Sequence, residues 1–154
     1  MTHEYTTAVK WTGNTGQGTA TYKGYKRTWD IAAPGKEVVH CSNDPVLGGD
    51  PSKLNPEDIL LSALSACHML WYLHLASTAK IKVLAYEDTP LGEGENLPDG
   101  SGRFLSATLK PKIEIEAGGD VARAKAIHHE IHKYCFIARS VNFPVSYDVE
   151  IIER

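Results

Sequence analysis

The chain has 154 residues, enough for one domain with its own hydrophobic core, and we expect residues 1–154 to form a single domain. Its 16 basic and 19 acidic side chains give a net charge of −3, and no basic cluster is longer than Lys26-Arg27, so nucleic acid is not an expected partner. A polar N-terminus without a signal-peptide pattern and an odd number of cysteines, three, predict a cytoplasmic protein with reduced thiols.

The first third of the chain is expected to contain three strands and a long loop. Residues 6–11, 18–25 and 27–33 are rich in Thr, Tyr, Val and Trp and are separated by Gly-containing turns, which is typical of an antiparallel meander. Residues 34–53 carry several Pro and Gly pairs and predict an irregular surface loop that contains Cys41. A thiol in such a loop is more often incidental than catalytic.

A long helix is predicted over residues 56–78. Asn55 supplies an N-cap, Pro56 fits the first helical position, and Glu57 and Asp58 favour the positive end of the helix dipole. Residues 59–79 contain no Asp, Glu, Lys or Arg, so the segment is long enough to cross a bilayer. Its Ser, Thr and His residues and its strand-like flanks instead favour a helix buried in a core or at a subunit interface, and no membrane partner is expected.

The remaining elements complete an α+β pattern. Residues 81–88 and 102–116 predict two strands joined by a polar loop over 91–101, and residues 145–152 predict a last strand. A second helix begins at Asp120 and places Cys135 on its inward face by apolar spacings of three and four. The order βββαββαβ predicts antiparallel sheets around a long buried central helix.

Cys67 and Cys135 each lie inside an apolar run and are the candidates for redox chemistry. Their 68-residue separation does not fit a metal knuckle, so any pairing between them must come from the fold. A reactive Cys67 needs a cation or a donor near its sulfur, and the adjacent His68 points about 100° away around the helix. An arginine from elsewhere is the better candidate, and the alternative is that both cysteines only fill the core.

The histidines of the second helix resemble a metal site in spacing only. His128 and His132 lie one turn apart, and Cys135 follows three residues later. A zincin motif needs Glu after the first His, where this chain has His129. We therefore expect solvated histidines and no metal or organic cofactor. A site made by His128, His132 and Cys135 remains the last-ranked alternative.

Three segments together resemble the OsmC/Ohr family of osmotically induced and organic-hydroperoxide-resistance proteins. They are Asn55-Pro56-Glu57-Asp58-Ile59-Leu60, then Leu64-Ser65-Ala66-Cys67-His68-Met69-Leu70-Trp71, and Cys135-Phe136-Ile137-Ala138 before Val141-Asn142-Phe143-Pro144-Val145. Each motif alone is weak, but the combination is specific and covers nearly the whole chain.

The resemblance implies an OsmC-like fold and a two-cysteine peroxidase acting on organic hydroperoxides or hydrogen peroxide. Cys67 would be oxidised to a sulfenic acid, and Cys135 would condense with it to a disulfide. A thiol reductant, namely a lipoylated protein, thioredoxin or a small thiol, would then reduce the disulfide. The family's activating arginine maps to Arg27, and its glutamate partner maps to Glu57.

The long helix adds an argument about assembly. Glu57 and Cys67 are ten residues apart, which is about 15 Å along a helix axis, so Glu57 does not reach its own Cys67. A bridging arginine or a second subunit must close this gap, which fits the intertwined homodimer that the resemblance implies. The alternative function is a non-catalytic module of the same fold that binds a small hydrophobic ligand at the dimer interface.

Overall fold

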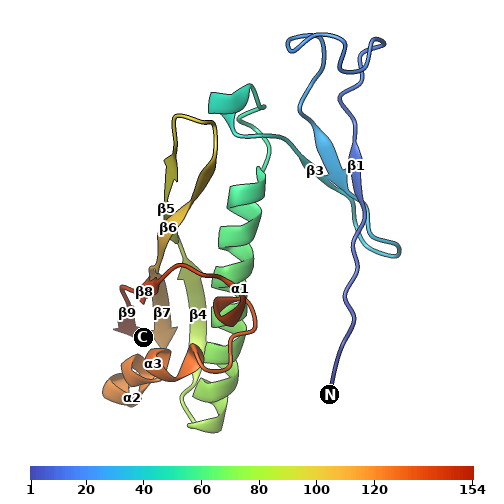
Figure 1. Cartoon of the computed structure of the whole chain (residues 1–154). Helices are drawn as coiled ribbons and strands as arrows, with labels where there is room; N and C mark the ends of the chain where they lie inside the picture. The colour runs from blue at the N-terminus through green and yellow to red at the C-terminus, as the bar shows by residue number, and fades with distance from the viewer. The chain divides into compact units, whose positions relative to one another are not determined.

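The computed structural model describes all 154 residues, and contacts along the chain divide it into two compact units, Met1–Ile59 and Leu60–Arg154. The first unit contains a three-stranded antiparallel sheet of β1 (Val9–Trp11), β2 (Trp29–Ile31) and β3 (Val39–Cys41) in that order, followed by a 3-10 turn, Pro45–Leu47. Figure 1 shows these strands in blue and cyan.

Two sequence predictions for the first unit were wrong. Residues 18–25 form turns rather than a strand, and the third strand, β3, comes from the predicted loop. It pairs with β2 through Trp29, and the Trp29 indole N–H donates to the carbonyl of Ser42 at 3.1 Å. This pairing buries Cys41, which we expected in a surface loop.

The long helix α1, Pro56–Thr78, is confirmed at both ends. The Asn55 side chain accepts a hydrogen bond from the Asp58 backbone N–H at 2.8 Å, and the Asp58 carboxylate accepts one from the Asn55 N–H at 3.1 Å. This reciprocal cap satisfies donors that the first turn leaves free. The helix ends before Lys80, whose φ of 61° is in the left-handed region.

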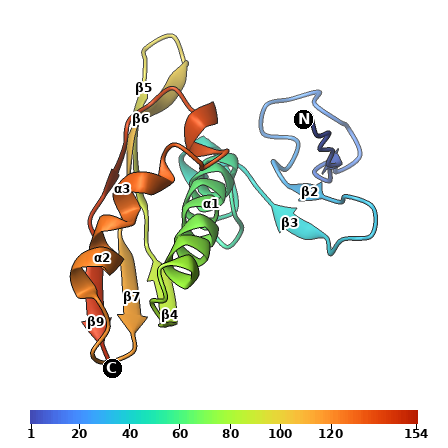
Figure 2. The same ribbon diagram turned by 90° about the horizontal axis from the view of Figure 1, so that it is seen from below.

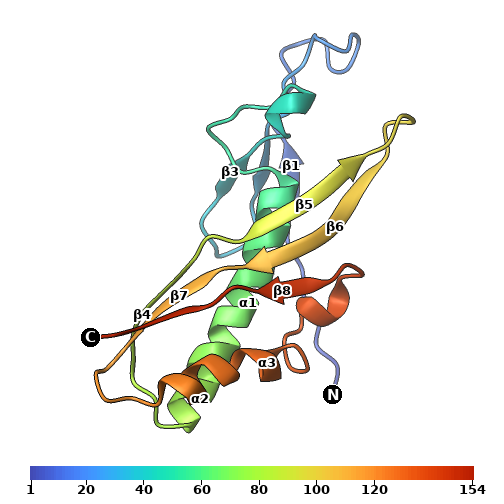
Figure 3. The same ribbon diagram turned by 90° about the vertical axis from the view of Figure 1, so that its left-hand side faces the viewer.

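The second unit contains six strands in two sheets. The first sheet has β4 (Val83–Asp88), β7 (Pro111–Ile115) and β9 (Glu150–Glu153), and the second has β5 (Leu91–Asn96), β6 (Gly102–Leu109) and β8 (Val145–Tyr147), each in that order. The β4–β7 and β5–β6 pairs are antiparallel, whereas β6–β8 and β7–β9 are parallel. Figure 3 shows the β5–β6 hairpin with β8 along one edge.

These strands refine the predicted order. β5 lies in the segment predicted as a polar loop, and the predicted strands over 102–116 and 145–152 are each divided into two. The last strands add parallel pairs to the predicted antiparallel pattern, while the α+β class itself is confirmed.

The second predicted helix is broken into short pieces. Asp120 caps α2 (Val121–Ala126) by accepting from the Arg123 N–H at 2.9 Å, and α3 (His128–Ile131) follows directly. A turn and a 3-10 turn, Ala138–Ser140, then lead to β8. Figure 2 shows α2 and α3 next to α1 and close to β7 and β9.

The core of the second unit lies between α1, the α2–α3 segment and the inward side chains of β6 and β7. From α1 it takes residues spaced by four, and from the α2–α3 segment it takes residues spaced by three and four, as the periodicity predicts. Its fully buried residues include Leu64, Tyr72, Ala76, Ala107, Leu109, Ile113, Ile115, Ala124, Ile127, Ile131 and Cys135.

Helix α1 is long and apolar enough, by length and composition, to cross a membrane. The core helices of soluble proteins can have the same length and composition. Here Leu64, His68, Tyr72 and Ala76 form a buried stripe along it, and His68 is hydrogen-bonded within the core. Within the chain, however, only 22% of the apolar window is buried, so α1 is a core helix along one stripe and not on every side.

Candidate active site

The structure brings Cys67 and Cys135 together. Cys67 lies half-buried in the middle of α1, and Cys135 lies fully buried in the turn after α3. The backbone N–H of Cys135 donates to Ile131 at 2.9 Å, and the Ala138 N–H donates to the Cys135 sulfur at 3.4 Å. Cys67 packs against the core cluster that contains Cys135 and is close enough to affect the pKa of its thiol, and neither cysteine is in a disulfide.

The two thiols are not equivalent. Burial raises the pKa of the Cys135 thiol to about 11, and the hydrogen bond with Cys67 adds to this effect. Cys135 is therefore a neutral thiol near pH 7. A thiolate is the reactive nucleophile, so Cys135 is poorly suited to begin an attack on an electrophile. The half-buried Cys67 is the more accessible of the pair.

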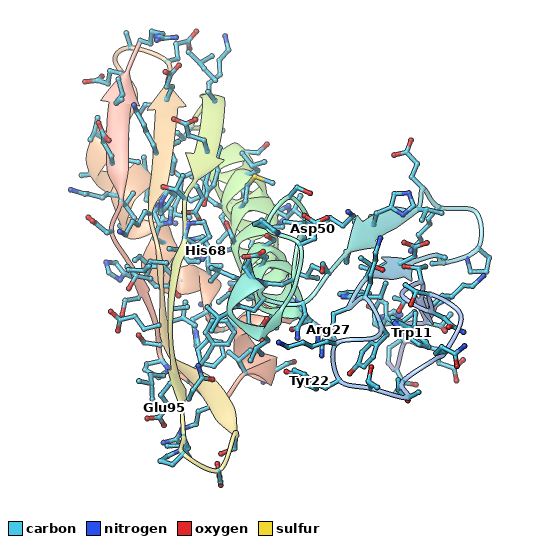
Figure 4. All side chains as sticks on the ribbon, turned by 90° about the horizontal axis from the view of Figure 1, so that it is seen from above. Trp11, Tyr22, Arg27, Asp50, His68 and Glu95 are labelled. Carbon is cyan, nitrogen blue, oxygen red and sulfur yellow. The ribbon has the colours of Figure 1, made fainter.

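Arg27 and Glu57 belong to the first unit and do not form an ion pair there. The Arg27 guanidinium donates to the carbonyls of Tyr22 and Tyr25, at 2.8 Å and 3.4 Å, and lies over both rings. Figure 4 shows Arg27 beside Tyr22. Glu57 is exposed in the first turn of α1. The predicted roles of both residues stay predictions.

Cys41 has the features of an unreactive thiol. It is fully buried in β3, and its Sγ–H donates to the Val39 carbonyl at 3.6 Å. Burial raises the pKa of Cys41, with the charge of Asp30 as a second cause. Both effects disfavour the thiolate.

A buried histidine pair next to the thiols was missed by sequence reasoning. His68 Nε2 and His128 Nδ1 are 2.8 Å apart, and the two side chains are 2% and 1% exposed. Figure 4 shows His68 on the side of α1 that faces the strands. The prediction that His128 is solvated was therefore wrong, because its partner lies on another helix and no local spacing indicates it.

The geometry does not support the last-ranked alternative, a metal site made by His128, His132 and Cys135. His128 is buried and paired with His68, whereas His132, one turn later, is exposed. No group of three or more His, Cys, Asp or Glu side chains converges in a way that could hold a metal ion. His128, His132 and Cys135 therefore do not form a common site.

The histidine pair predicts a loss of stability in acid. Burial lowers the pKa of His68 to about 4 and that of His128 to about 3, with the charges of His68 and His129 as further causes for His128. Because both pKa values lie below the usual 6.5, the unfolded chain binds these protons first as the pH falls. The stabilisation is complete above about pH 6.5 and is lost toward pH 4 and 3.

Within that window each histidine is expected to cost about 1.4 kcal/mol of unfolding free energy per pH unit. Urea unfolding between pH 7 and 4 measures this slope. The His68→Leu/His128→Leu double variant should show a shallower slope, whereas His129→Leu, which changes an exposed neighbour, should keep the parent slope. Equal slopes in the parent and the double variant would contradict the prediction.

A family model described as OsmC-like protein matches residues 49–150, about two thirds of the chain. The chain belongs to the OsmC family. The matched region includes α1 with Cys67 and the turn with Cys135, and it begins after Arg27. The predicted family is thereby confirmed. No curated protein sequence matches the chain.

Solved structures of OsmC proteins share the fold along the full chain. An OsmC-like protein of unknown function from Vibrio cholerae O1 biovar eltor has a TM-score of 0.86 and 24% identity over 96% of this chain and 99% of its own. Organic hydroperoxide resistance proteins from Elizabethkingia anophelis and Legionella pneumophila both have TM-scores of 0.67, with 18% and 19% identity. These matches cover 100% and 98% of this chain, and 100% and 99% of theirs.

At these identities the structural matches establish the OsmC fold alone. The chain spans nearly the full length of each matched structure, which agrees with the predicted α+β architecture.

Proposed function

We propose that this OsmC protein is a thiol-dependent peroxidase that reduces organic hydroperoxides, with hydrogen peroxide as a smaller alternative substrate. The observation that carries the proposal is that Cys67 packs against the core cluster containing Cys135 inside the second unit, near enough to raise the pKa of the Cys135 thiol. Further support comes from matched structures described as organic hydroperoxide resistance proteins. The matched Legionella protein is also described as a predicted redox protein.

In the proposed cycle Cys67 acts first. Its thiolate attacks one peroxide oxygen, the O–O bond breaks, and the products are a Cys67 sulfenic acid and an alcohol. Cys135 then attacks the sulfenic sulfur to give a disulfide and water, and a thiol reductant restores both thiols by exchange. The high pKa of Cys135 supports this order, because the buried neutral thiol is the weaker nucleophile toward peroxide.

Arg27 and Glu57 are proposed to assist Cys67. A guanidinium stabilises a thiolate and polarises a peroxide, and a carboxylate fixes the position of a guanidinium. An Arg27–Glu57 pair would have to form in addition to the tyrosine contacts of Arg27, or in place of them. No metal or organic cofactor enters this cycle.

We also propose a cytoplasmic homodimer in which residues 1–154 act as one domain. The three unpaired cysteines suit a reducing compartment. Helix α1 keeps apolar residues at its surface, including Leu70, which is 62% exposed, and such a surface favours association with a second copy. The full-length matches to other OsmC structures support a single domain.

Thiol titration tests the proposed chemistry directly. Addition of one equivalent of an organic hydroperoxide to the reduced protein is expected to remove two titratable thiols per chain, and peptide mapping should assign them to Cys67 and Cys135. The thiol of Cys41 should remain and serves as the internal control. An unchanged count would contradict the peroxidase and favour a binding module in which the cysteines only pack.

A further inference from the structure

The buried pair His68–His128 joins the two segments that carry the thiols. His68 directly follows Cys67 in α1, and His128 begins α3, whose last turn leads to Cys135. The 2.8 Å contact between His68 Nε2 and His128 Nδ1 is a hydrogen bond within the core. The peroxidase cycle proposed above uses neither histidine.

Other contacts between the same segments surround the thiols. The Tyr72 hydroxyl donates to the Ala124 carbonyl at 2.9 Å, and the Trp71 ring stacks on Tyr134 with centroids 4.9 Å apart. Trp71 lies one turn after Cys67, and Tyr134 directly precedes Cys135. The thiol pair is therefore flanked on both helical segments by side chains that hold α1 against the α2–α3 segment.

Tyr147 of β8 supports the pair from the sheet. Its ring stacks on His68 with centroids 4.8 Å apart. Burial raises the pKa of Tyr147, and the charge of Cys135 is the second cause. The rings of His68, His128 and Tyr147 therefore form one cluster, in which His128 and Tyr147 are themselves 6.5 Å apart between centroids.

The hydrogen bond is more specific than apolar packing. Two neutral imidazoles share one donated proton, and His128 Nε2 is left buried without a partner. An apolar pair of similar shape would fill the same space and leave no unpaired nitrogen. A hydrogen bond between two side chains has a preferred direction. It therefore fixes both the rotation of α1 about its axis and its position along that axis relative to α3, whereas apolar packing tolerates larger shifts of both.

We propose that His68 and His128 are positioning residues that hold Cys67 and Cys135 at disulfide-forming separation. This inference rests on the proposed two-cysteine function. The step that it assists forms the Sγ–Sγ bond and breaks the S–O bond of the Cys67 sulfenic acid. The hydroxyl leaves with the Cys135 proton as water, the Cys135 sulfur is oxidised, and the sulfenic sulfur is reduced.

The test measures the thiol pair without peroxide. Each reduced variant is equilibrated with mixtures of oxidised and reduced dithiothreitol, and the fraction of Cys67–Cys135 disulfide is determined by peptide mapping. His128→Leu is expected to lower the effective concentration of the pair about tenfold or more, which raises its reduction potential by about 30 mV. A parent-like potential for His128→Leu would overturn the proposal.

Two controls separate positioning from general damage. His128→Asn keeps an amide atom within reach of His68 Nε2, so it should recover most of the parent potential, and His129→Leu changes only an exposed neighbour. If His128→Leu does not unfold cooperatively, the His68→Leu/His128→Leu variant replaces it, because it leaves no unpaired nitrogen. A parent-like potential in that variant would equally overturn the proposal.

The outcome also distinguishes this inference from the proposed function. Suppose that oxidised dithiothreitol forms the Cys67–Cys135 disulfide and that the histidine variants shift its reduction potential, while peroxide oxidises no thiol. That result would contradict the peroxidase and support the positioning role. If the parent forms no Cys67–Cys135 disulfide with dithiothreitol, the positioning role is overturned.

Discussion

Cys67→Ser is expected to abolish peroxide consumption. A serine hydroxyl at this position has no activating base and does not become a nucleophile near pH 7, so activity should fall to background, a loss of at least about a thousandfold. The measurement is the rate of disappearance of an organic hydroperoxide in the presence of excess dithiothreitol. Because Cys67 is only half-buried at the edge of the core and serine is similar in size, the substitution should leave the fold intact.

Cys41→Ala is the matched control for this experiment. It removes the third thiol, which is buried in the first unit and hydrogen-bonded to Val39. The variant should consume peroxide at the parent rate. Comparable consumption by Cys67→Ser and the parent would refute the assignment of Cys67 as the attacking thiol.

Cys135→Ser is expected to allow one oxidation and to block turnover through the disulfide. Cys67 can still reduce one hydroperoxide, but its sulfenic acid finds no thiol to condense with. Rapid mixing should show a burst of one peroxide per chain, and mass spectrometry should show a gain of one oxygen atom on the Cys67 peptide. Excess peroxide should then convert this species to the sulfinic acid.

The variant also needs a check on folding, because position 135 is fully buried and receives the Ala138 N–H. A serine oxygen can accept the same hydrogen bond, so cooperative thermal unfolding should be retained. Sustained turnover at the parent rate, with no accumulated sulfenic acid, would show that Cys135 is not the resolving thiol.

Elements with local signals were predictable from the sequence. The start of α1 follows from Asn55, Pro56 and Asp58, whose capping role depends on residues within one turn. The buried positions of the second helical segment also follow from their spacing. The break between α2 and α3 near Ile127 was not predictable from the sequence. The backbone stays nearly helical at this point, so the spacing of apolar residues continues unchanged across the break.

Elements that depend on distant partners were not predictable. The Gly- and Glu-rich segment Leu91–Asn96 becomes a strand because β6 supplies its hydrogen bonds, and β3 exists because β2 does. His128 is buried because its partner is 60 residues earlier in the chain. The approach of Cys67 to Cys135 followed only from the family resemblance, since spacing alone left their relation open.

The parallel pairing of the last strands has a consequence for synthesis of the chain. β9 pairs with β7, and β8 pairs with β6. The segment with Cys135 lies in the connection from β7 to β8. During translation, the helix with Cys67 leaves the ribosome long before β9 can close its sheet. Because Cys135 comes 68 residues later, a Cys67 that worked as proposed would pass through a stage without its resolving thiol, in which a sulfenic acid on the nascent chain could be oxidised further to sulfinic acid.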